Sequence, residues 1–393
     1  MRILICSVSA ALGGMERRIE AETRLLTALG HDVLVATTRF PELKRWKSDI
    51  QNAGGRYVDW APYKFVERQH FAVPFRWLAL ATLPVLRRKR IDFAHIAMPW
   101  NFVGMSMAYV LSRANIPYVV GIHGKFGRQP LTERGRPFVR EAMSGLVGGY
   151  AVSDPVNDSF MRLYAGLLPQ STRMETILNG IDIGCFRPDA AKRLSVRQSL
   201  GLDDSHFVVV FCGRIDSMKR PLFALGVFAR FAAKYPKGRL LIVGDGPETA
   251  ALKSQMASLR IEDRVTLTGQ VPNTAPYYAA SDCYLSTSAQ EGCPLAAAEA
   301  LASGLPAVVP NDDVFSSVYG ASNTVQRCDP AGPEGWEKAL LSVALLDARS
   351  KHLLGSEAQE FAKTNFSTEI MNRRLTSFYQ DVFSRLGRAQ QPS

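Results

Sequence analysis

Short apolar runs alternate with amphipathic segments along most of the chain, in two successive sets. The first set has apolar runs at 3–7, 32–37, 93–97, 118–122 and 148–152, with helical spacing between several of them. The second set has runs at 208–212, 240–243, 265–268, 283–286 and 307–309. Strands that alternate with helices are typical of a parallel sheet covered by helices on both faces. The sequence therefore predicts an α/β chain with two doubly wound domains.

The segment NGIDIGCFRP at 179–188 separates the two sets, because Asn-Gly is a strong turn former. A chain of 393 residues is long enough for two domains that each bury a core. We predict a first domain at 1–178, a second at 179–366 and a flexible tail at 387–393. Ligands of such sheets bind beyond the carboxyl ends of the strands, so two facing domains would enclose a cleft.

Positive charge is concentrated in the first half of the chain. Residues 1–180 hold 24 Lys and Arg against 14 Asp and Glu, whereas the rest holds 23 against 22. This asymmetry predicts an anionic partner: a membrane surface, a nucleic acid or a phosphorylated substrate. The densest cluster, Arg87, Arg88, Lys89 and Arg90, follows an apolar run from Phe75. It fits either an interfacial helix at anionic lipid headgroups or a solvated helix end. No nucleic-acid-binding module is recognisable.

The cysteines indicate a reducing, cytoplasmic compartment. The six cysteines have neither C-x-x-C nor zinc spacing, and several lie in apolar runs, where free Cys behaves as a small hydrophobe. The first apolar run is interpreted as a buried strand rather than a signal peptide. The apolar stretch at 77–86 is too short to span a bilayer.

The segment SAQEGCPLAAAEALASGLP, at 288–306, holds Glu291 and Glu299 with seven residues between them. Pro294 is predicted to begin a helix, which places Glu291 and Gly292 in the loop before its N-terminus. Free N–H groups and the helix dipole make such a terminus a seat for oxygen-rich ligands. Glu291 can accept hydrogen bonds from vicinal hydroxyls, and Glu299 suits a second group such as a ribose. A capping Glu and a lone buried Glu fit the spacing equally well.

Further polar residues follow other predicted strands. Arg214 and Lys219 lie in GRIDSMKRP and can hold two phosphates, although a surface loop with ordinary charges has the same pattern. Gly13 and Gly14 allow backbone amides to approach an anion. His123 can donate to a sugar hydroxyl or stabilise developing charge, although a lone His is more often structural.

Taken together, these segments resemble the family 4 glycosyltransferases, which are retaining enzymes of GT-B architecture. The resemblance covers nearly the whole chain, in the family's order: GGMERR, HG, NGID with F-x-P, GR with K, VGDGP, and E-G-x-P-x4-E-A-x-A-x-G-x-P. It implies two Rossmann-like domains that face each other across a cleft. It also implies a final helix, at about 367–386, that crosses back to the first domain.

The resemblance also implies roles for single residues. Glu291 would contact the transferred sugar, and Glu299 the ribose. Arg214 and Lys219 would hold the diphosphate. The other implied donor contacts are the backbone of Gly13 and Gly14, His123 beside the reacting sugar, Val271 at the nucleobase, and Gly292, Cys293, Pro294 and Leu295 around the sugar and phosphate.

The implied reaction moves a hexose-type sugar from a nucleoside diphosphate sugar to an acceptor hydroxyl, with retention. No D-x-D metal clamp occurs in the sequence, so Arg214, Lys219 and helix dipoles are expected to stabilise the leaving group without a metal or cofactor. We expect a lipid-linked or saccharide acceptor, in bacterial polysaccharide, lipopolysaccharide or glycolipid assembly, and a location in the cytoplasm or at the inner face of the plasma membrane.

Other functions remain compatible with these motifs. DFAHIAM places Ala97 where many relatives of the family carry a second His, so the chain departs from the family pattern on the acceptor side. A nucleotide-sugar epimerase, a glycan phosphorylase and a non-catalytic nucleotide-sugar-binding scaffold are alternatives. A nicotinamide oxidoreductase would need a fuller glycine fingerprint, followed by an acid about 20 residues on.

Overall fold

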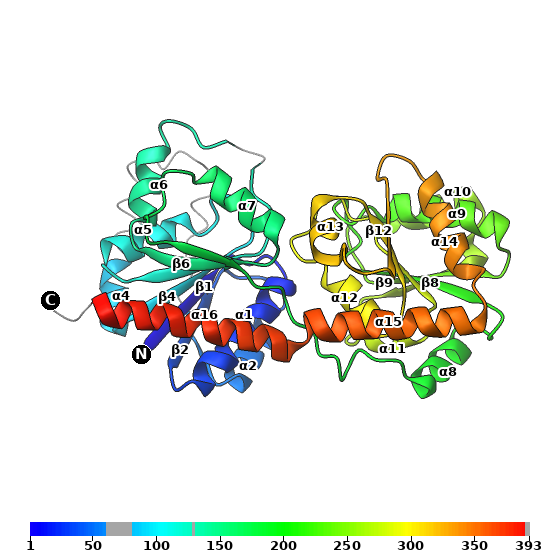
Figure 1. Cartoon of the computed structure of the whole chain (residues 1–393), viewed down its shortest axis with the longest axis horizontal. Coiled ribbons are helices and arrows are strands. Elements are labelled where there is room, and N and C mark those ends of the chain that lie inside the picture. Colours follow the sequence, from blue (N-terminus) through cyan, green and yellow to red (C-terminus); the bar gives the residue numbers. More distant parts are fainter. Residues whose placement is uncertain (60–80, 128–129, 390–393) are drawn as a thin grey trace. The chain divides into compact units, whose positions relative to one another are not determined.

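The computed structural model describes residues 1–59, 81–127 and 130–389. The chain divides into two compact units, Met1–Asn179 with Met371–Ser393, and Gly180–Ile370. Each unit contains one parallel sheet with helices packed against it (Figure 1). The predicted α/β class with two Rossmann-like domains is therefore confirmed.

The first unit has a sheet with the strand order β3-β2-β1-β4-β5-β6-β7 in the described residues. Its strands are β1 (Arg2–Ser7), β2 (Asp32–Thr37), β3 (Arg56–Tyr57), β4 (Phe93–Met98), β5 (Tyr118–Ile122), β6 (Leu146–Ala151) and β7 (Arg173–Thr176). Its helices are α1 (Gly14–Ala28), α2 (Leu43–Asn52), α4 (Leu83–Lys89), α5 (Met105–Arg113), α6 (Arg136–Met143), α7 (Asp154–Leu163) and most of α16 (Thr368–Ala389). The strand order reverses between β1 and β4, which is where ligands of such sheets bind.

The last helix, α16, belongs to the core of the first unit. Its apolar face packs into the same buried cluster as β1 and α1. The buried members from α16 are Met371, Leu375, Phe378, Tyr379 and Val382. Residues from the end of the chain therefore complete a core that its first residues begin.

The second unit has a sheet with the order β10-β9-β8-β11-β12-β13 in the described residues. Its strands are β8 (Phe207–Cys212), β9 (Gly238–Val243), β10 (Val265–Gly269), β11 (Cys283–Leu285), β12 (Ala307–Pro310) and β13 (Val325–Cys328). Its helices are α8 (Ala190–Ser199), α9 (Pro221–Lys234), α10 (Thr249–Leu259), α11 (Ala275–Ala279), α12 (Leu295–Ala302), α13 (Asp313–Tyr319), α14 (Glu334–Ala344) and α15 (Ala348–Phe366), with a short 3-10 turn η1 (Glu262–Arg264). Here the order reverses between β8 and β11.

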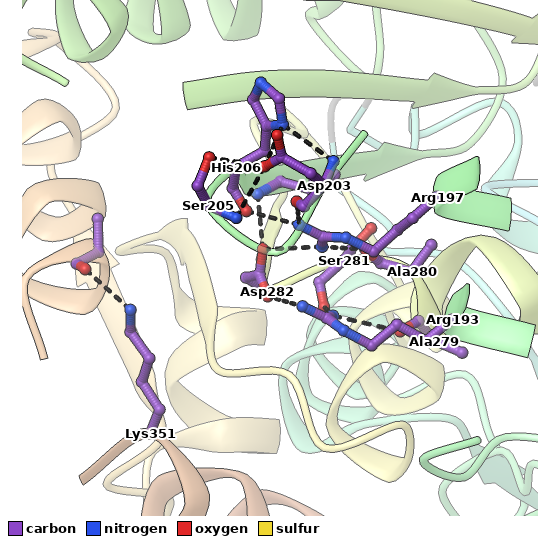
Figure 2. Close-up of polar contacts among 12 residues, drawn as sticks. Arg193, Arg197, Asp203, Ser205, His206, Ala279, Ala280, Ser281, Asp282 and Lys351 are labelled. Atoms are coloured by element: carbon purple, nitrogen blue, oxygen red, sulfur yellow. Dashed lines mark hydrogen bonds and ion pairs between the residues drawn. The ribbon is translucent and has the colours of Figure 1, made fainter. Parts of the chain in front are cut away.

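Two arginines, of which Arg197 is buried, attach α8 to the amino ends of β8 and β11 (Figure 2). Arg197 is 2% exposed and donates to the carbonyls of Ala280, Asp203 and His206 at 2.8, 2.7 and 2.6 Å. Asp282 accepts from Arg193 at 2.8 Å and from the backbone N–H of Val208 at 2.7 Å. These bonds hold the edge of the sheet opposite to the carboxyl ends of its strands.

The differences from the predicted elements are concentrated at the sheet edges. The short strands β3, β7 and β13 were not predicted, and each lies at an edge of its sheet. Edge strands have one unpaired side, and β3 and β7 are half-exposed, so they carry no continuous apolar run. Pro294 was predicted to begin a helix but is the N-cap of α12, which begins at Leu295.

Candidate functional site

Two predicted site residues that are far apart in the sequence meet in the second unit. Lys219 lies in the loop after β8, and Glu291 in the loop after β11. Their side chains form an ion pair between Nζ and Oε1. The Lys219 side chain is 28% exposed and that of Glu291 13%. Because β8 and β11 are neighbours in the sheet, the two loops leave it side by side. The result is a half-buried cation beside a carboxylate at the carboxyl ends of parallel strands.

Glu299 is held by a different partner. It is the fifth residue of α12, and its Oε2 accepts a hydrogen bond from the Tyr278 hydroxyl at 3.2 Å. Tyr278 is fully buried, and burial, followed by the nearby Cys212 and Glu299, raises the pKa of its hydroxyl well above the usual value. This tyrosine therefore stays protonated and orients the carboxylate. Sequence reasoning did not identify Tyr278.

Arg214 is the most exposed of the predicted phosphate-binding residues. Its side chain is 59% exposed and its Nε lies 3.3 Å from Asp216 Oδ2. The loop that carries it packs closely on the loop after β9, because a Cβ atom at Gly244 would lie 1.9 Å from the Gly213 carbonyl oxygen. Only glycine fits at Gly244, which also has a φ of 142°. The VGDGP motif therefore supports the loop that carries Arg214.

The remaining predicted donor contacts of the second unit lie in or next to two loops that follow strands of its sheet. Val271 is half-buried two residues after β10. Gly292 and Cys293 are half-buried in the loop before α12, which begins at Leu295. Pro294 caps α12, and its carbonyl accepts a 2.6 Å hydrogen bond from the buried Tyr319 hydroxyl. Tyr319 is a second supporting residue that the motifs did not indicate.

In the first unit, Gly13 and Gly14 lie at the exposed start of α1. Gly13 is the N-cap of the helix, and its backbone N–H donates to Glu16 Oε2 at 2.8 Å. Burial raises the pKa of Glu16. Because Glu16 already occupies the Gly13 amide, a ligand at this helix end has to use the amides that follow it.

His123 directly follows β5. Both of its ring nitrogens are buried and have no hydrogen-bond partner among the described residues. Burial, followed by the positive charge of Arg18, lowers the pKa of His123 to about 3. The imidazole is therefore neutral at physiological pH. A Cβ atom at Gly124 would lie 2.0 Å from the Pro99 carbonyl oxygen, so the HG pair also reflects close backbone packing.

A buried charged network that sequence reasoning missed is centred on Glu22. Arg18 Nε donates to Glu22 Oε1 at 2.9 Å, and His95 Nδ1 lies 2.7 Å from Oε2. The hydroxyls of Tyr150 and Tyr379 also donate to this carboxylate. Burial alone would raise the pKa of Glu22, but His95, Arg18 and Tyr150 hold it well below the usual value.

This network contacts both His123 and the end of the first unit. The Tyr150 ring packs edge-on against His123 with centroids 6.3 Å apart. Arg18 Nη1 donates to the Leu178 carbonyl at 3.1 Å and to Asn179 Oδ1 at 3.2 Å. Arg18 and Glu22 lie one turn apart on α1, on the helix face that also buries Ile19 and Leu26. Charged residues at positions of the buried stripe of a helix were the signal in the sequence that could have indicated this network.

A cationic hollow lies at the opposite, amino-terminal edge of the first sheet. Arg2, Arg56, Arg88 and Lys89 line an open cavity of about 650 Å³, together with Leu34, Tyr57, Val58 and Val85. Arg2 and Arg56 share one carboxylate, that of Asp32, each at 2.7 Å. Arg87, Arg88 and Lys89 form the last turn of α4, and Arg90 follows with a φ of 50°. Residues 75–80 of the preceding apolar run lie outside the described residues.

Comparison with known proteins identifies the family. The model of the glycosyl transferases group 1 matches residues 192–360, and the model of Glycosyltransferase Family 4 matches residues 12–184. Alpha-monoglucosyldiacylglycerol synthase of Streptococcus pneumoniae is 24% identical over 94% of this chain and 83% of that protein. D-inositol 3-phosphate glycosyltransferase of Rhodococcus opacus is 34% identical over 57% of this chain and 51% of that protein.

Solved structures show the same fold. Anabaena Alr3699/HepE in complex with UDP superposes with a TM-score of 0.79 at 18% identity, over 97% of this chain and 100% of that one. WaaG, a glycosyltransferase involved in lipopolysaccharide biosynthesis, has a TM-score of 0.67 at 15% identity, over 95% and 98%. The fold is that of the GT-B glycosyltransferases. The chain belongs to glycosyltransferase family 4.

No helix in the ranges that the structure describes is both long enough and apolar enough to cross a membrane.

Proposed function

We propose that this chain transfers a hexose-type sugar from a nucleoside diphosphate sugar to an acceptor hydroxyl, with retention and without a metal ion. The observation that supports this most directly is the Lys219–Glu291 ion pair at the carboxyl ends of β8 and β11. An ammonium group in that position can bind a diphosphate, and the adjacent carboxylate can accept hydrogen bonds from sugar hydroxyls.

In this proposal, the second unit stabilises the leaving nucleotide. Lys219 and Arg214 would bind the two phosphates, and the 59% exposed Arg214 is free to exchange Asp216 for a phosphate. The N-termini of α9 and α12 add partial positive charge. Glu299, oriented by Tyr278, would accept from ribose hydroxyls, while Val271, Gly292, Cys293 and Leu295 would surround the base, sugar and phosphate.

The acceptor hydroxyl would attack on the face that the nucleotide leaves, and the departing phosphate oxygen would take its proton. No side chain is then required as a base. His123 would act as a neutral hydrogen-bonding group beside the sugar, which fits its low pKa and its two unpartnered ring nitrogens.

We further propose a UDP-sugar as donor and a lipid-linked or phosphorylated acceptor at the inner face of the plasma membrane. Support for the donor comes from the HepE structures, which contain UDP and, in one case, UDP-glucose. Support for the acceptor comes from relatives named as glucosyldiacylglycerol and inositol 3-phosphate enzymes. The cationic hollow would then contact anionic headgroups.

The decisive experiment measures binding by calorimetry in excess EDTA. The panel contains UDP, GDP and ADP as free nucleotides, together with the common nucleotide sugars of each. Micromolar binding of one nucleotide is expected, followed by transfer whose product has the donor's anomeric configuration by NMR. Binding of none of them would reject the proposal. Interconversion of the sugar without an acceptor would indicate an epimerase, and dependence on inorganic phosphate a phosphorylase. Binding without turnover across an acceptor panel would indicate a scaffold.

A further inference from the structure

The two loops that carry Lys219 and Glu291 are joined by backbone contacts as well as by the ion pair. The Ala289 N–H donates to the Met218 carbonyl at 2.7 Å. Beside this bond, Thr287 Oγ1 lies 2.9 Å from the Lys219 carbonyl oxygen and 3.0 Å from that of Arg220. The hydroxyl has one hydrogen, so it is shared between the two carbonyls.

Thr287 makes these contacts from a fully buried position. It is 0% exposed and lies two residues after the end of β11. Both hydrogen bonds are partly buried, and a carbonyl that loses its donor in such a place costs free energy unless water replaces the donor. The hydroxyl is therefore an important link between the loop after β11 and the loop after β8.

The segment that Thr287 contacts has an unusual backbone. Arg220 has a φ of 51°, in the left-handed region, and precedes Pro221 at the start of α9. Non-glycine residues occupy this region only where surrounding contacts hold them, and a following proline restricts the backbone further. The Thr287 hydroxyl donates to the carbonyls on either side of the Arg220 Cα, those of Lys219 and Arg220, and so fixes this turn.

We infer that Thr287 is a positioning residue for diphosphate binding, because it fixes the turn from which Lys219 reaches Glu291. This inference rests on the proposed function of the Lys219–Glu291 pair. A misplacement of about 1 Å in a binding group can reduce the rate by about 100-fold. Thr287 itself would contact no substrate and would act through the position of Lys219.

Three substitutions test this role. Thr287→Val keeps the shape and removes the hydroxyl, whereas Thr287→Ser keeps the hydroxyl. Thr324→Val is the matched control, since Thr324 is 3% exposed, shares a 2.8 Å hydrogen bond with Ser322 and lies directly before β13, at the amino-terminal edge of the same sheet. Thr287→Ala replaces the valine variant if that variant does not fold.

The measurements are UDP affinity by calorimetry and the kcat and KM of transfer, with GDP in place of UDP if the nucleotide panel selects it. Thr287→Val is expected to weaken affinity and lower kcat/KM by about tenfold to 100-fold. Thr287→Ser and Thr324→Val are expected to stay within about threefold of wild type. Equal values for Thr287→Val and wild type, or equal losses in both valine variants, would overturn the inference.

A double-mutant cycle separates positioning from general destabilisation. In a Lys219→Ala background, Thr287→Val should cause no further loss of UDP affinity, because its effect runs through Lys219. Ligand-detected NMR measures the weak affinities involved. If Thr287→Val reduces UDP affinity by the same factor in the wild-type and Lys219→Ala backgrounds, Thr287 acts independently of Lys219. If the wild-type protein binds no nucleotide, the proposed function is wrong. If the wild-type protein binds nucleotide and Thr287→Val has the same affinity and the same kcat/KM, only the positioning role of Thr287 is wrong.

Discussion

Lys219 and Glu291 are neighbours in space but have separable roles in the proposed reaction. Lys219→Met removes a phosphate-binding charge, so nucleotide affinity should fall at least tenfold and turnover by about 100-fold or more. Glu291→Gln should lower turnover similarly but spare UDP affinity, because UDP carries no transferred sugar. Calorimetry and initial rates measure both effects.

The control for this pair is Lys234→Met, because the Lys234 side chain is 64% exposed and pairs with Glu337 in the same unit. It should change neither affinity nor rate. Retention of wild-type turnover in both Lys219→Met and Glu291→Gln would contradict the assignment of the site.

The neutral state of His123 has a consequence for stability at acid pH. Its folded-state pKa of about 3 lies below the ordinary value of 6.5. As the pH falls below about 6.5, the unfolded chain binds a proton on this residue before the folded chain does, so stability is lost toward pH 3. Above pH 6.5, His123 contributes nothing to the pH dependence of the free energy of unfolding.

His123→Asn should therefore lose less stability than wild type between pH 6.5 and pH 4, as measured by urea unfolding. NMR of wild type should show no titration of the His123 ring at physiological pH. A His123 resonance that titrates near its ordinary pKa would contradict the buried, neutral assignment.

At the scale of one helix, α1 allows a matched comparison of buried and exposed charge. Arg18–Glu22 and Arg24–Glu20 are both ion pairs four residues apart, but the side chains of the first are 1% and 0% exposed, and those of the second 61% and 30%. Glu22→Gln leaves buried Arg18 without its counter-charge and should destabilise the protein by about 3–5 kcal/mol. Glu20→Gln should cost less than about 1 kcal/mol.

Urea unfolding of both variants checks this difference. Equal effects of the two substitutions would show that the buried network is not held by charge.

Tyr379→Phe offers a milder test of the same network. It removes the hydroxyl of a residue on α16 that donates to Glu22 at a distance of 3.2 Å. It should destabilise by about 1–3 kcal/mol.

Across the whole molecule, the excess of positive charge in residues 1–180 has a local focus at the cationic hollow. Arg88→Glu with Lys89→Glu should reduce binding to vesicles that contain an anionic phospholipid by at least tenfold, because each basic residue near such a surface contributes about 1 kcal/mol. Binding of wild type should weaken with added salt and be small on neutral vesicles. Vesicle flotation measures the effects of the double substitution, of added salt and of lipid charge on binding.

The matched control is the double reversal Lys237→Glu with Lys253→Glu, at two exposed positions of the second unit. It makes the same change in net charge and should leave flotation at the wild-type level. Equal losses in the two double variants would show a response to net charge and not to the hollow.

The predicted strands show why much of this fold was accessible from sequence. The strands at 32–37 and 118–122 were predicted at their observed bounds, because buried parallel strands appear as continuous apolar runs. Edge strands such as β3 and β7 carry no such run and were missed. The motifs proposed to bind the donor follow apolar runs directly in the sequence. It could therefore be predicted that Arg214, Lys219 and Glu291 lie in loops after strands.

What the sequence determined by itself was local: the α/β class, most of the strands, and which residues follow their carboxyl ends. Apolar periodicity and turn residues act over a few neighbouring positions, so they can be read along the chain. Tertiary structure alone decided the partners. The order β10-β9-β8-β11 brings Lys219 to Glu291 and Thr287, and the return of α16 brings Tyr379 to Glu22. Such pairs depend on which strands and helices become neighbours, and this is a property of the folded chain as a whole.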